Sequence, residues 1–170
     1  MKPRNQGMTL LELLIVMAIL GIAFALSAGA MSGGRDRREM REGQKTFEQS
    51  LERVRTLVRR YSYDYVHTIA TDKKSFVFKA RNAAGAAVTN SAPDINGKLP
   101  DSVTVEKKSP STVLLTNPLF LAPFARTSGG AAPICFELVS SISSLKTAVD
   151  LVGVTGKVVS REISNTSGCI

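Results

Sequence analysis

The sequence predicts an α+β protein in which a long N-terminal helix packs on an antiparallel β-sheet. Three observations support this fold class. A segment without charged residues runs from Leu13 to Met31, an amphipathic stretch follows it, and short β-type runs separated by Gly, Pro, Asn and Ser fill the remainder. With 170 residues, the chain has room for one modest domain beside the helix.

The charge-free segment from Leu13 to Met31 would form a helix of roughly 28 Å at about 1.5 Å per residue, close to the hydrocarbon thickness of a bilayer. Three interpretations compete: a cleaved secretory signal, an ordinary single-span anchor, and an anchor whose acidic residue has a partner. Glu12 bears on this choice, because an unpaired carboxylate next to an apolar segment costs up to about 3 kcal/mol. The first two interpretations leave Glu12 unexplained.

The first twelve residues show an ordered pattern of side chains. A short basic leader, MKPRNQG, ends in Gly7 and is followed by Met8, Thr9, two leucines and Glu12. This pattern resembles the precursors of type IV pilins and of type II secretion pseudopilins, in which Glu is the fifth residue of the mature chain.

The resemblance implies cleavage between Gly7 and Met8 by a prepilin peptidase, and methylation of the new Met8 amine. The apolar segment then stays on the mature protein, and the amine of a neighbouring subunit can pair with Glu12 and set the axial register. The subunit would first span the inner (cytoplasmic) membrane once, with its head in the periplasm or outside. It would then join other pilins or pseudopilins in a filament at the cell surface.

The predicted organisation has four parts: a leader (1–7), an apolar half of the helix (8–34), an amphipathic half (35–65) and a β-rich head (66–170). The amphipathic half begins with a mixed-charge stretch, Arg35–Glu42, which we expect in water or among lipid headgroups. Its apolar residues recur at helical spacing as one stripe: Met40, Phe47, Leu51, Val54, Val58, Tyr61 and Tyr65. This stripe predicts a face that packs on the head.

Seven β-type runs are predicted in the head, because apolar and polar residues alternate or β-branched residues cluster in them. They are Val66–Ala70, Ser75–Ala80, Ser102–Glu106, Thr112–Thr116, Ile134–Ser141, Lys146–Val152 and Lys157–Ile163. Arg81–Pro100 is predicted as a long surface loop, and Leu119–Ala122, between two prolines, as a covered loop or irregular edge.

Several segments beyond the apolar half of the helix resemble the H-type minor pseudopilins and related minor pilins more than other members of the family. They are the Arg-bearing helix end Leu51–Arg60, the Phe120–Gly130 segment and the closing VDLVGVTGKVVSRE. Gly29 stands where major pilins often have Pro, which also favours a minor subunit. Arg59-Arg60-Tyr61 departs from the subfamily pattern, in which Ser or Asn and then Ala usually follow the arginine.

The two cysteines, Cys135 and Cys169, suit an exported protein with one disulfide, although two free buried thiols remain the alternative. With one histidine, His67, the chain lacks a plausible metal-ligand set, and His67 is interpreted as a structural or surface residue. No nucleophile motif and no nucleotide-binding glycine pattern is present in the sequence, so we predict a structural protein with no cofactor, not an enzyme.

A second function remains open, because the chain carries a formal net charge of +8. Some minor pilins of natural transformation systems bind incoming DNA through basic residues of the head. The candidate phosphate contacts here are Lys73, Lys74, Lys107, Lys108, Lys157 and Arg161. No aromatic residue is interleaved with them, and basic doublets in turns are also ordinary solvated surface.

Overall fold

The structure is a computed structural model that describes residues 10–88, 91–109, 119–122, 125–127, 133–152 and 155–163. Within these ranges, the side chains of residues 26–33, 107–109 and 126 are not described. The chain forms two compact units, Met1–Arg35 and Asp36–Ile170. One helix, α1 (Leu10–Tyr61), contributes its first part to one unit and its remainder to the other.

Helix α1 ends at Tyr61, so the prediction that it extends to residue 65 is wrong by four residues. Ser62 takes a left-handed backbone conformation with φ of 54°, and its N–H donates to the Val58 carbonyl at 2.9 Å, which terminates the helix. Tyr65 is instead in strand β1 (Asp64–Ile69). It still reaches the core, because its side chain is fully buried.

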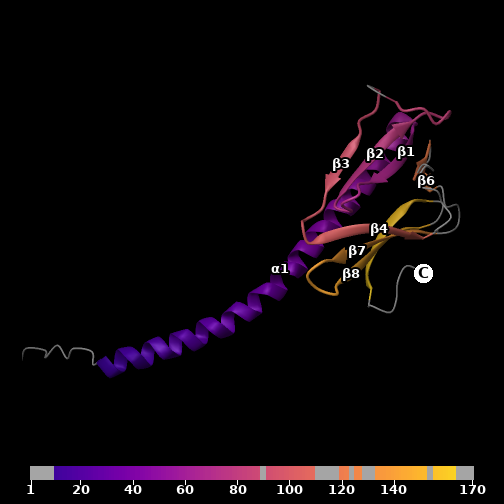
Figure 1. Cartoon of the computed structure of the whole chain (residues 1–170). Helices are drawn as coiled ribbons and strands as arrows, with labels where there is room; N and C mark the ends of the chain where they lie inside the picture. The colour runs from indigo at the N-terminus through magenta and orange to yellow at the C-terminus, as the bar shows by residue number, and fades with distance from the viewer. Residues whose placement is uncertain are drawn as a thin grey trace, which may run out of the picture. The chain divides into compact units, whose positions relative to one another are not determined.

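The head contains two separate antiparallel sheets, whereas the sequence predicted one (Figure 1). The first has the order β3-β2-β1-β5-β6 and the second the order β4-β7-β8-β9. Besides β1, the strands are β2 (Ser75–Arg81), β3 (Ile95–Lys98), β4 (Val103–Ser109), β5 (Phe120–Leu121), β6 (Arg126–Thr127), β7 (Ile134–Ser140), β8 (Lys146–Val152) and β9 (Lys157–Ile163). The predicted α+β class is therefore confirmed, with its β layer divided.

Six of the predicted β-type runs correspond to strands, and β8 and β9 have the predicted bounds. The seventh, Thr112–Thr116, lies outside the described residues. The prediction of a loop throughout Arg81–Pro100 is wrong, because β3 lies within it and pairs with β2. Leu119–Ala122, predicted as loop or irregular edge, contains the two-residue strand β5, which pairs with β1 and β6.

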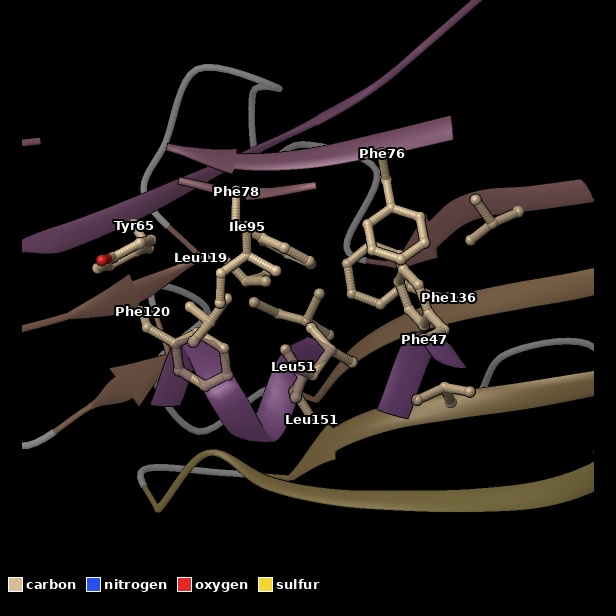
Figure 2. Packing of buried hydrophobic residues seen from close by; sticks show 14 of the residues in the cluster. Phe47, Leu51, Tyr65, Phe76, Phe78, Ile95, Leu119, Phe120, Phe136 and Leu151 are labelled. Carbon is tan, nitrogen blue, oxygen red and sulfur yellow. The ribbon is translucent and has the colours of Figure 1, made fainter. Parts of the chain in front are cut away.

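The core of the head lies between the second part of α1 and both sheets. Five residues of the predicted stripe are buried on the helix: Met40, Phe47, Leu51, Val54 and Val58. Figure 2 shows the Phe47 ring beside Phe76 and Phe136. The ring of Phe47 meets that of Phe76 on β2 at 5.0 Å and that of Phe136 on β7 at 5.1 Å, both edge to face. One helix side chain thus contacts both sheets.

Gly97 on β3 is opposite Phe76 on β2, and the Phe76 ring covers the place that a side chain would need. A Cβ atom added at residue 97 would come within 2.1 Å of a ring carbon. A phenylalanine ring lying over a cross-strand glycine is a known way to protect a sheet position that lacks a side chain. Gly97 therefore permits the close packing of Phe76 in the core.

We expect Gly97→Ala to lower the free energy of unfolding of the head by about 1–3 kcal/mol, because Phe76 must leave its position against Phe47. Urea denaturation of the full chain in detergent, followed by circular dichroism, measures this change. Gly34→Ala is the control, since a Cβ there has no atom within 4 Å. Equal stability of the two variants would contradict the packing role of Gly97.

Candidate processing and assembly site

The beginning of α1 presents apolar side chains to its surroundings on every side. From Leu10 to Phe24 the large apolar residues are between 41% and 78% exposed, and consecutive ones such as Leu13, Leu14 and Ile15 are all included. Consecutive residues point in different directions around a helix, so no side of this segment is covered by the described residues. A helix that is apolar all round requires a cover of lipid or protein.

Glu12 lies in the first turn of α1 and is exposed among these apolar residues. A carboxylate in the first turn is favoured by the helix dipole, which accounts locally for an acid at that position. Gly7 and Met8, the predicted cleavage and methylation positions, lie outside the described residues. In the part of the chain that the structure describes, no helix has both the length and the apolar character needed to cross a membrane.

The comparison with protein families bears on this N-terminal segment. Residues 2–28 match the model of the prokaryotic N-terminal methylation motif. The chain carries a prepilin-type N-terminus. The matched residues include Gly7, Met8 and Glu12, so the resemblance to type IV pilins and pseudopilins is confirmed for the segment that suggested it.

The chain also has a more distant similarity to a solved structure. A solved structure, that of the minor pseudopilin EpsH from the type 2 secretion system of Vibrio cholerae, is similar with a TM-score of 0.47 and 14% sequence identity. The similarity covers 74% of this chain and 99% of that chain. No curated protein matches the chain.

Cys135 lies on β7 and is fully buried. Its neighbours on the strand, Ile134 and Phe136, face the main core, so Cys135 points to the other face of the sheet, where it packs with Ala148 and Ile163. Among the described residues no cysteine is free. The other predicted member of the disulfide, Cys169, lies outside the described residues.

The candidate DNA contacts do not gather on one strand or at one edge of the structure. Lys107 and Lys108 are on β4 and Lys157 and Arg161 are on β9, the two opposite edge strands of the four-stranded sheet. Arg161 donates from Nε to Asp150 Oδ2 at 2.9 Å, and Lys73 is paired with Glu106. An arginine held by an aspartate has less free charge to offer a phosphate.

His67 is 2% exposed on β1, and its ring meets the edge of Phe136 at 5.5 Å and an interplanar angle of 89°. The structure therefore places His67 in the packing between the two sheets. Within the described residues, no group of three or more His, Cys, Asp or Glu side chains is placed to hold a metal ion.

The pKa values of two side chains are shifted, one on β1 and one in the turn between β1 and β2. Burial raises the pKa of Tyr65 to about 12, with a smaller contribution from nearby Asp94, and its hydroxyl donates to the Pro93 carbonyl at 3.1 Å. The pKa of Asp72 is lowered, because its carboxylate accepts from the backbone N–H groups of Lys74 and Ser75 in the turn before β2. Both shifts are explained by local structure and do not mark a reactive site.

Sequence reasoning missed two carboxylates that connect α1 to the second sheet. Asp36 was expected in water or headgroups with the rest of its charged stretch, but it is only 3% exposed. The Ser140 hydroxyl donates to Asp36 Oδ1 at 2.6 Å, and the Ser102 hydroxyl donates to Glu39. Their three-residue spacing places both acids on one helix face, which was the available signal.

Proposed function

We propose that this protein is a structural subunit, a minor pilin or pseudopilin, of a type IV pilus, a type II secretion system or a competence pseudopilus. The single observation that carries the proposal is the methylation motif at residues 2–28. The exposed apolar beginning of α1 supports it, because subunits that assemble through this helix would cover one another's apolar surface. The H-type resemblance of the head favours a minor subunit.

In this proposal, a prepilin peptidase cleaves after Gly7 and Met8 becomes the methylated N-terminus. The apolar half of the helix holds the subunit in the inner membrane as a single span until assembly, with the head in the periplasm or outside. The partners are then other pilins or pseudopilins. The β-rich head has a structural role, and binding of DNA has no observation in its favour.

The proposed processing predicts the mass of the mature chain. Protein recovered from cells that contain a prepilin peptidase should lack residues 1–7 and carry one added methyl group on Met8. Protein from cells without the peptidase should keep the leader. Intact-mass spectrometry with N-terminal sequencing measures both. A chain cleaved beyond Ala30, or one that keeps its leader in the presence of the peptidase, would refute the proposed class.

Assembly should depend on Glu12 in a way that membrane insertion does not. We expect Glu12→Ala to insert normally, because the substitution only makes the segment more apolar, and to lose filament assembly. Sheared-filament yield and membrane fractionation measure the two properties. Glu42→Ala is the matched control, since Glu42 is also exposed on α1 but lies outside the motif. Normal filaments from Glu12→Ala would count against the role of this carboxylate.

We also propose a disulfide between Cys135 and Cys169, which would attach the C-terminus to β7. The complete burial of Cys135 on the face opposite the main core supports this bond. In the chain-entropy model, a loop of this length contributes roughly 3–4 kcal/mol to stability. Cys169→Ser should lower the urea midpoint by a corresponding amount. Peptide mapping without reductant should find the two cysteines in one linked fragment, and separate fragments would disprove the bond.

A further inference from the structure

The head contains a pocket of about 280 Å³ beside α1. Four residues of α1 line one side: Arg37, Met40, Arg41 and Gln44. The other side is formed by the beginning of β8 with the residue before it, and by the end of β9: Leu145, Lys146, Thr147, Glu162 and Ile163. All nine residues belong to the same compact unit, Asp36–Ile170. The volume is near the lower end of the range for small-molecule sites, roughly 300 Å³.

Cationic groups dominate the rim of this pocket. Arg37 and Arg41 are one helical turn apart, and both are exposed. Within the described part of the chain, neither forms an ion pair, although Glu162 lines the same pocket. Like charges at this spacing destabilise a helix, and a bound anion would remove that cost.

Two further polar side chains of the pocket are fixed in place. Lys146 Nζ lies 3.2 Å from Glu137 Oε1, and the Glu137 side chain is only 7% exposed. Gln44 donates from Nε2 to Glu48 Oε1 at 2.9 Å and to Ser160 Oγ at 2.8 Å. These bonds fix the positions of Lys146 and Gln44, and among the described residues neither arginine donates a side-chain hydrogen bond. Buried Met40 and Ile163 add apolar surface to the same lining.

We propose that this pocket binds the phosphate group of an anionic phospholipid. Guanidinium groups are suited to this ligand, because their planar donors match two phosphate oxygens at once. An apolar lining beside a cationic rim fits a ligand that is part charged and part hydrocarbon. In the sequence, Arg37 follows soon after the charge-free segment that ends at Met31, where a membrane-anchored helix reaches the headgroups. The inference thus rests on the membrane stage of the proposed function.

The experiment uses the full mature chain in nanodiscs of phosphatidylcholine that contain a minor fraction of phosphatidylglycerol. Native mass spectrometry of the released protein compares how much of each lipid remains bound. We expect phosphatidylglycerol to be enriched over its bulk fraction by about fivefold for each arginine that contacts it. Arg37→Gln with Arg41→Gln should return the bound ratio to the bulk ratio. Circular dichroism checks that this double variant keeps its fold.

The matched control is Arg53→Gln with Arg59→Gln, which removes the same charge from exposed positions of α1 outside the pocket. This control should keep the enrichment. Equal loss in both double variants would mean that general charge attracts the lipid, and the assigned site would then be wrong. Displacement of phosphatidylglycerol by an equal concentration of inorganic phosphate would assign the pocket to soluble phosphate and overturn the lipid assignment.

The same nanodiscs separate this inference from the proposed function. Insertion of the chain into both lipid compositions without enrichment would refute the lipid site and leave the pilin-like function intact. Failure to insert into either composition would refute the membrane stage, and the lipid site with it.

Discussion

The head depends on the packing of one helix face against two sheets that share no strand. Phe47 contacts Phe76 in one sheet and Phe136 in the other, and Leu51, Val54 and Val58 continue the same face with no exposed surface. The Val105 N–H on β4 donates to the Lys73 carbonyl, in the turn between β1 and β2, at 2.8 Å, and apolar contacts centred on α1 join both sheets in one core. His67 against Phe136 adds a direct contact between the sheets.

Hydrogen bonds complement this packing by fixing the position of the second sheet along α1. Apolar contacts are not directional, so they allow a sheet to slide along a helix at low cost. The Ser140 bond to Asp36 connects α1 to the end of β7, and the Ser102 bond to Glu39 connects α1 to the residue before β4. Asp36 is buried, and a buried carboxylate that lost its donor would cost about 1–3 kcal/mol, so its bond with Ser140 penalises a shifted arrangement more than it strengthens the native one.

The sequence predicted those features that depend on local periodicity. The stripe from Met40 to Val58 and the bounds of β8 and β9 follow from spacing alone. Strand β3 could not be found in this way, since its sequence, INGK, reads as a turn and becomes a strand only because β2 pairs with it. The helix was predicted to reach Tyr65 because Tyr65 follows Tyr61 at helical spacing, but Tyr65 lies on β1. At the candidate site, Glu12 could be recognised from the motif. The burial of Asp36 could not be predicted, because this residue lies in a run of charged residues.

The position of Glu12 suggests how a filament could select one register. The apolar beginning of α1 would slide against the same segment of another subunit with little change in buried area, because its neighbours are similar in size and polarity. A carboxylate breaks this equivalence. If it paired with the proposed methylated amine of Met8 in an apolar environment, the carboxylate would be satisfied only at one offset, and other offsets would leave charge unpaired at a cost of several kcal/mol. Under the proposed function, the residue that would make the segment a poorer membrane anchor would also make it a more specific assembly surface.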